Sequence, residues 1–306
     1  NPSGLLGATT LEATSVGQPT TQAFSVWQDN TNYAFSVFMK ANVGDYAVLG
    51  NYGNTIGNSW MRIKLSDNSF TYGGTGFSNG KVETLTNGWI RVSVSFISSA
   101  INTSRSGFKV GLASSSSFSL GNIGDKLDIW GAQIEALSYA TSYIPTEGSS
   151  VTRNQETCIN ATPEINSEEG VLYFEGAALS DDGTFKFISL NTNASNRLRL
   201  GYSSTTNKIS VLIQVDGAVK FNNSQIGNIN QVDFNKIAVS YSASGVKVFV
   251  NGVEVNSNTV NSSFALLNKL DFRDGDTLNP FFGNTKDLQV YTKALSDAEL
   301  INLTTI

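Results

Sequence analysis

The chain has 306 residues, of which 40% are hydrophobic and 15% are charged, and its formal net charge at pH 7 is −5. This acidic balance argues against nucleic-acid binding, which needs a basic surface to displace counterions from phosphates, and no apolar stretch is long enough to insert into a membrane as a helical span. Histidine is absent and Cys158 is the only cysteine, which excludes Ser-His-Asp and Cys-His nucleophiles, the usual zinc sites and a disulfide within the chain. We expect Cys158 to be an unreactive thiol.

Short runs of alternating apolar and polar residues fill the first half of the chain and are separated by Gly and Asn. The runs span residues 24–27, 33–41, 60–65, 89–96, 108–112 and 127–134. Short strands at this spacing are typical of a sandwich or a barrel, and no segment here reads as a good helix. We predict a first β-sandwich domain over residues 1–152.

The alternation stops in the middle of the chain and then begins again. Pro145, Gly148, Pro163 and many polar residues interrupt it between residues 142 and 166, so we place a linker at residues 153–166 and a second domain at residues 167–306. The runs of this second half span residues 170–174, 185–190, 197–202, 208–215, 236–241, 246–255, 268–272 and 286–291. The predicted fold is therefore all-β, with two tandem antiparallel β-sandwich (jelly-roll) domains and one short C-terminal helix.

Two local signals in the second half are specific. The Asn251-Gly252 pair lies between two runs of β-branched residues, which predicts a hairpin with a type I′ turn, because this turn needs positive φ at both positions. Ser296 precedes Glu299 by three residues ahead of an apolar stretch. This spacing predicts a capping box at the start of a helix.

The split of strand residues between two faces indicates a candidate binding surface. In the run that begins at Trp60, every second residue is apolar, which leaves Trp60, Arg62 and Lys64 on the other face. The run that begins at Trp89 leaves Trp89 and Arg91 in the same way. An indole stacks on the apolar face of a sugar ring, and a neighbouring guanidinium offers donors to hydroxyls. The alternative is structural, with the tryptophans capping the edge of the core under a cover of arginine.

Glycine-rich segments between these runs hold further aromatic residues. We expect them to lie on loops, where they line the rim of a binding site or only anchor the loops themselves. These residues are Tyr52, Tyr72 and Phe77.

Acidic residues are candidate ligands for calcium and candidate catalytic pairs. Calcium prefers carboxylate and carbonyl oxygens on loops, and the acidic turns offer Asp181, Asp182, Asp274 and Asp276, with Asp128 on a strand. None has the spacing of an EF-hand loop, so ordinary turn acids are the alternative. No two carboxylates share one strand face at the spacing of a glycosidase. We expect a protein that is not an enzyme and has no cofactor other than a candidate calcium ion.

A resemblance to a known module is carried by residues 33–40, 88–94, 127–135, 140–146 and 151–153. Together they resemble a module found in bacteriophage tail-fibre and other virion proteins, which is similar to carbohydrate-binding jelly rolls. The resemblance covers most of residues 20–153. It implies that Trp89 and Trp130, which lie in the defining stretches, serve the framework of the module, and that Trp60 is a better candidate for ligand contact.

The second half resembles a laminin-G or concanavalin-A-like sandwich. The resemblance is carried by residues 234–241, 246–254 and 288–300, and it implies a family that includes lectins, adhesion modules and some glycosidases. The glycosidases of that family usually carry a Glu-x-Asp-x-x-Glu strand motif, which this sequence lacks. The resemblance therefore favours a non-catalytic role.

These observations together predict a non-catalytic, glycan-binding or receptor-binding part of a phage tail-fibre-like protein. Its expected partner is a host surface glycan, with no nucleic acid and no membrane insertion, and its expected location is the virion or the extracellular space. Tail fibres are commonly trimers, so a homo-oligomer is a further expectation. The alternatives are a structural or decoration module without a soluble ligand, and an accessory or catalytic part of a polysaccharide-degrading enzyme.

Overall fold

The structure is a computed structural model that divides the chain into two compact units, Asn1–Arg153 and Asn154–Ile306. It describes residues 1–5, 7–15, 20–24, 28–52, 59–98, 107–115, 121–146, 148–152, 163–275 and 278–306. Cys158 lies outside these residues. No helix in the described part of the chain is long and apolar enough to cross a membrane.

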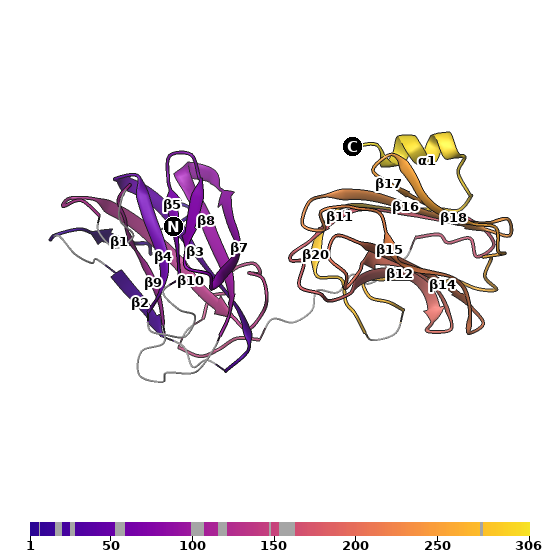
Figure 1. Cartoon of the computed structure of the whole chain (residues 1–306), viewed down its shortest axis with the longest axis horizontal. Coiled ribbons are helices and arrows are strands. Elements are labelled where there is room, and N and C mark those ends of the chain that lie inside the picture. Colours follow the sequence, from indigo (N-terminus) through magenta and orange to yellow (C-terminus); the bar gives the residue numbers. More distant parts are fainter. Residues whose placement is uncertain are drawn as a thin grey trace. The chain divides into compact units, whose positions relative to one another are not determined.

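The first unit consists of two antiparallel sheets of five strands each (Figure 1). Sheet A has the order β1 (Thr9–Glu12), β10 (Lys126–Glu135), β3 (Asn32–Val43), β8 (Trp89–Ile97) and β7 (Phe77–Thr84). Sheet B has the order β2 (Thr20–Phe24), β9 (Gly107–Leu112), β4 (Tyr46–Tyr52), β5 (Trp60–Lys64) and β6 (Phe70–Gly73). A single 3-10 turn, η1 (Thr86–Gly88), precedes β8.

Aromatic rings join the inner faces of these two sheets. The ring of Phe108 on β9 stacks on Phe35 of β3 at 4.5 Å between centroids. It also meets Phe96 of β8 at 4.9 Å and Phe77 of β7 at 5.8 Å. Aromatic pairs at such distances stabilise the fold beyond the contribution of the apolar area that they bury. One ring from sheet B thus contacts three strands of sheet A.

The second unit also has two antiparallel five-stranded sheets. Sheet C has the order β18 (Val253–Asn258), β17 (Gly245–Val250), β16 (Asn235–Ser242), β11 (Gly170–Ala178) and β20 (Gly283–Tyr291). Sheet D has the order β15 (Ala218–Ile226), β14 (Ile209–Val215), β13 (Asn196–Tyr202), β12 (Lys186–Asn193) and β19 (Lys269–Asp271). The prediction of an all-β fold with tandem sandwiches and one C-terminal helix is confirmed.

Contacts on both faces make β11 the most buried strand of the second unit. Its inner face packs against sheet D, where the Tyr202 hydroxyl donates a hydrogen bond to the Gly176 carbonyl at 2.6 Å. On its outer face, Tyr173 joins a cluster that includes Phe249 of β17 and Leu300 of helix α1 (Asp297–Thr304). Figure 1 shows α1 lying over the strands of sheet C. The helix therefore shields an apolar part of that sheet from water.

Both local predictions for the second unit are confirmed. Asn251 and Gly252 have φ of 50° and 83°, as a type I′ turn requires, and Val250 pairs with Val253 across the turn. The Ser296 hydroxyl accepts a hydrogen bond from the Glu299 amide, and the Glu299 carboxylate accepts one from the Ser296 amide at 2.8 Å. The capping box fixes the start of α1.

We expect Ser296→Ala to lower the free energy of unfolding of the second unit by about 1 kcal/mol, because an amide at the helix start loses its acceptor. Ser296→Asp keeps an acceptor oxygen and serves as the control, with a loss of only a few tenths of a kcal/mol. Urea unfolding followed by circular dichroism measures both values. Equal stability of the two variants would contradict a role for the cap.

Candidate functional site

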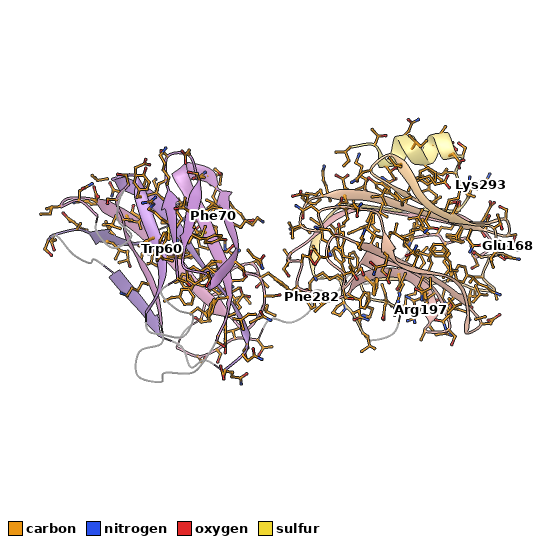
Figure 2. All side chains as sticks on the ribbon, viewed as in Figure 1. Trp60, Phe70, Glu168, Arg197, Phe282 and Lys293 are labelled. Atoms are coloured by element: carbon orange, nitrogen blue, oxygen red, sulfur yellow. The ribbon has the colours of Figure 1, made fainter. Side chains whose placement is uncertain are left out.

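Strand β5 carries the predicted contact residues on the outer face of sheet B. Met61 and Ile63 are fully buried in the core, whereas Trp60, Arg62 and Lys64 are partly exposed. Figure 2 labels Trp60 among the side chains of the first unit. The face split expected from the sequence is thus present in the structure. The three side chains have different surroundings, and these decide what each can do.

Trp60 lies between two glycines on the neighbouring strands. Its register partners are Gly50 on β4 and Gly73 on β6. A Cβ atom added to Gly73 would lie 1.5 Å from Cζ2 and 1.7 Å from Cε2 of Trp60, so the indole covers the backbone of Gly73 with one ring face. We call this pair of Trp60 and Gly73 the indole platform.

Arg62 and Lys64 make contacts within the protein. The Arg62 guanidinium lies over the Tyr46 ring at 5.6 Å and donates a hydrogen bond to the Ser115 carbonyl at 2.6 Å. Lys64 forms an ion pair with Asp67 at 2.7 Å, which raises the pKa of Lys64 and lowers that of Asp67. Arg62 thus holds the chain that follows β9, and its expected contact with sugar hydroxyls stays a prediction.

The three aromatic residues expected on loops all belong to strands. Tyr52 ends β4, although its side chain lies outside the described structure. Tyr72 is the register partner of Met61, so its side chain lies on the opposite face of sheet B from Trp60. Its hydroxyl accepts a hydrogen bond at 2.5 Å from the Gly80 amide of β7, in the facing sheet. Burial raises the pKa of Tyr72. Phe77 is 8% exposed and belongs to the core. Tyr72 and Phe77 therefore join the two sheets and do not form a rim around Trp60.

Trp89 and Arg91 lie on the outer face of sheet A and so belong to a different surface from Trp60. Arg91 lies over the Phe38 ring at 5.4 Å, and it donates hydrogen bonds to the Ser36 hydroxyl at 2.8 Å and to the Thr141 carbonyl. Arg91 thereby anchors the segment after β10 to the sheet.

The same surface of sheet A carries a second aromatic contact. Trp130 packs against Phe38 at 5.2 Å and against Tyr143 at 4.6 Å. These rings serve the framework of the sandwich, as expected from the sequence. The two Trp-x-Arg patterns therefore do not combine into one binding face.

The described acidic residues that the sequence predicts as calcium ligands have partners within the protein. Asp182 accepts a hydrogen bond at 2.6 Å from the ammonium of Lys186, whose side chain is 1% exposed. Asp274 is 2% exposed, and its carboxylate lies 3.5 Å from the Arg199 guanidinium and accepts a hydrogen bond at 2.9 Å from Asn279. These ion pairs engage Asp182 and Asp274 with cations of the protein itself, and their expected role as calcium ligands stays a prediction.

The remaining acids do not complete a metal site in the described structure. Asp181 accepts a hydrogen bond from Gln231 at 3.2 Å, and Asp128 accepts one from Thr10 at 2.6 Å. Asp276 lies outside the described residues. Among the residues that are described, no group of three or more acidic, cysteine or histidine side chains is placed to hold a metal ion.

The fold pairs two carboxylates that the sequence pattern does not bring together. Glu175 on β11 and Asp287 on β20 are register partners on the outer face of sheet C. Glu175 forms an ion pair with Lys286 at 2.7 Å, and Asp287 accepts a hydrogen bond from Gln289 at 2.5 Å. Only the strand register places these residues side by side, so spacing in the sequence gave no signal. Both carboxylates are engaged by protein donors.

Residues 140–301 match the family model described as the concanavalin A-like lectin/glucanases superfamily. No curated protein sequence matches the chain. Among solved structures, the chain is similar to the CBM40 domain of Ruminococcus gnavus IT-sialidase bound to α2,3-sialyllactose, with 20% identity and a TM-score of 0.38 over 46% of this chain and 84% of that one. It is also similar to domains LG4-5 of the mouse laminin α1 chain, with 10% identity and a TM-score of 0.32 over 94% of this chain and 88% of that one. TM-scores this low do not support a conclusion about the function of this chain.

We expect Gly73→Val to displace the indole of Trp60, because the new side chain occupies the position of the ring. Tryptophan fluorescence should change in this variant and should not change when Gly73→Val is made in a Trp60→Phe background. Thr71→Val on the same face of β6 is the control and should leave the emission unaltered. An unchanged spectrum for Gly73→Val would show that the ring does not cover the glycine.

We expect Asp182→Asn to lower the free energy of unfolding of the second unit by about 3 kcal/mol, because Lys186 then remains buried without its counter-charge. Asp181→Asn, at the neighbouring position, should cost less than about 1 kcal/mol. Calcium and EDTA should leave the melting temperature of the unaltered chain unchanged. A clear fall in melting temperature with EDTA would instead indicate a metal bound by these acids.

Proposed function

We propose a function from one premise: the chain belongs to the concanavalin A-like lectin/glucanases superfamily. The proposed function is non-catalytic binding of a glycan. The indole platform carries this proposal for the first unit. Trp60 lies partly exposed on the outer face of sheet B, with glycines at both register positions beside it, and the apolar face of a pyranose ring stacks on an indole.

The surroundings of the indole platform favour a neutral stretch of glycan. The nearest cations on its strand are engaged, Lys64 with Asp67 and Arg62 with the Ser115 carbonyl. Stacking is then the main contribution to binding, and a single stacking contact gives weak affinity. Several copies of the chain on one particle would strengthen attachment, because each further contact is made at a high effective concentration.

The glycan we propose is a host surface polysaccharide, and the chain is a receptor-binding part of a phage tail-fibre-like virion protein. The resemblance of residues 20–153 to tail-fibre modules supports this part of the proposal. In this proposal the protein lies on the virion, outside the host cell, in an assembly of several copies such as a trimer. The low share of charged side chains, 15%, suits a surface built from neutral polar residues.

We expect Trp60→Ala to weaken glycan binding by about tenfold or more, because the stacking surface is lost. A glycan array identifies the bound polysaccharide, and isothermal titration calorimetry measures its affinity. Trp60→Phe keeps a smaller ring and should retain part of the affinity.

The other outcomes of this experiment distinguish the alternatives. Equal affinity after Trp60→Ala would move the site away from the indole platform. Failure of the unaltered chain to bind any glycan, together with particles that do not assemble without it, would favour a structural role. Release of new reducing ends or of unsaturated products from the polysaccharide would establish an enzyme, and Glu175 with Asp287 would then be the first residues to replace.

A further inference from the structure

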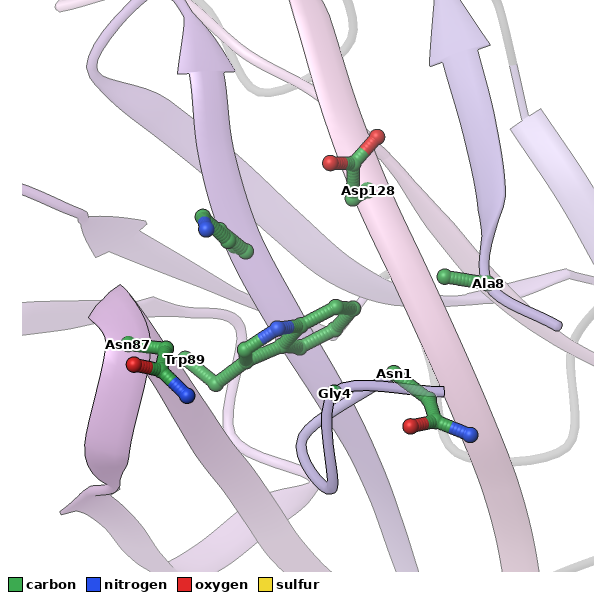
Figure 3. Close-up of a pocket in the computed structure, with 7 residues that line it drawn as sticks. Asn1, Gly4, Ala8, Asn87, Trp89 and Asp128 are labelled. Atoms are coloured by element: carbon green, nitrogen blue, oxygen red, sulfur yellow. The ribbon is translucent and has the colours of Figure 1, made fainter. Parts of the chain in front are cut away.

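A hollow of about 470 Å³ lies on the outer face of sheet A, the opposite sheet of the first unit from the indole platform. Figure 3 shows Trp89 at its centre, between Asn87 on one side and Gly4 and Asn1 on the other. The residues that line it come from the N-terminal segment, β3, η1, β8 and β10: Asn1, Gly4, Ala8, Lys40, Asn87, Trp89 and Asp128.

The strand register explains why these side chains converge. Thr10, Asp128, Lys40 and Trp89 form one row across β1, β10, β3 and β8, because each is the register partner of the next. Residues paired in this way point to the same side of an antiparallel sheet. Their sequence neighbours Leu127, Met39 and Ile90 pack into the core, so the row faces outward.

The hollow contains hydrogen-bond donors that no described residue engages. In the described structure, the Lys40 ammonium has no hydrogen-bond or ion-pair partner, and neither does the amide group of Asn87. Trp89 is only 4% exposed, and within the same residues nothing accepts a hydrogen bond from its indole nitrogen. The indole nitrogen itself remains accessible to solvent. The donors therefore suit a ligand that supplies acceptor oxygens.

Asp128 gives the hollow one acceptor next to these donors. It lies directly opposite Lys40 in the register of β10 and β3, yet the two side chains form no ion pair in the described structure. Instead, Asp128 accepts a hydrogen bond at 2.6 Å from the Thr10 hydroxyl through Oδ1. Its second carboxylate oxygen has capacity for another donor. Lys40 and Asp128 thus both line the hollow without forming an ion pair with each other.

We propose that this hollow is a second binding site, specific for a sugar that carries a carboxylate, such as a uronic acid. Lys40 pairs with the ligand carboxylate, and Trp89 and Asn87 donate hydrogen bonds to ring or hydroxyl oxygens. Asp128 accepts a hydrogen bond from a sugar hydroxyl. Hydrogen bonds between charged groups are stronger than neutral ones, so Lys40 contributes most of the affinity.

The combination of charges selects this ligand over simpler ones. An anion without hydroxyls gains the contact with Lys40 but is repelled by Asp128 and offers it no donor. A neutral sugar satisfies Asp128 but leaves Lys40 without a counter-charge. Only a ligand that carries a carboxylate and hydroxyls on one ring can pair with Lys40 and also donate a hydrogen bond to Asp128. The site does not depend on Trp60, so failure of the indole platform and failure of this site are separate results.

The test is a titration of the full chain with sodium D-glucuronate, followed by the indole N–H signals in ¹⁵N-resolved NMR spectra. Trp89→Phe assigns the signal of Trp89. We expect this signal to shift on addition of D-glucuronate, and we expect Lys40→Gln to weaken binding by about tenfold or more. Lys40→Arg keeps the charge and should retain part of the affinity. Lys81→Gln, which removes an exposed lysine from the same sheet, should leave the affinity unchanged.

Two comparison ligands and an Asp128 variant test which ligand the hollow selects. D-Glucose and sodium acetate should each bind at least about tenfold more weakly than D-glucuronate, and Asp128→Asn should narrow the difference between D-glucuronate and acetate. The proposal is overturned if D-glucuronate does not shift the Trp89 signal, if Lys40→Gln binds as tightly as the unaltered chain, or if acetate binds as tightly as D-glucuronate. Trp60→Ala should leave the titration unchanged.

Discussion

The stacking of rings around Phe108 is the contact on which the arrangement of the first unit depends. This one ring from β9 meets Phe35, Phe77 and Phe96 on three strands of the opposite sheet. Each of these strands must turn the same set of alternate residues inward, since a slip of one residue would expose the whole apolar set. The inner faces are fixed in this way, and the residues left outside are fixed with them. Trp60 and Trp89 consequently lie on the outer faces of two different sheets.

The sequence could predict the fold class and the inner and outer faces of the longest runs, because period-two alternation is a local property. It also predicted the Asn251-Gly252 turn and the capping box of Ser296 and Glu299, whose partners lie close in the chain. Strands β6 and β7 were missed because Gly, Ser and Asn interrupt their apolar pattern. Tyr72 and Phe77 were therefore expected on loops, although they belong to these strands.

Partners distant in the chain explain what the sequence could not predict about the candidate sites. The carbonyl that holds Arg62 belongs to Ser115, 53 residues away. Glu175 meets Lys286 across 111 residues. Lys40 and Asp128 are brought into one row by the order of strands in sheet A, and no pattern in either run identifies the other. Contacts of this kind follow from topology, whereas spacing along the chain reports only neighbours in one element.

The chain has few charged side chains, and several of those in the second unit form ion pairs that are largely buried. Lys186 and Asp182 form a mostly buried pair, and Asp274 lies between two arginines. A buried charge needs a partner, because leaving water costs several kcal/mol for an isolated ion. Such pairs fix the positions of turns and strand ends relative to the sheets. The acidic turns of the second unit are therefore parts of its framework.

The contact between Trp60 and Gly73 has a consequence for how this protein can vary. The two positions lie 13 residues apart on adjacent strands and share one space, because the indole occupies the volume that any side chain at position 73 would need. In homologous chains these positions should therefore change together. A chain that keeps tryptophan on β5 should keep glycine on β6, and a chain with a larger residue on β6 should have a smaller one on β5. The residues at these two positions would then identify the family members that retain a flat aromatic surface on this sheet.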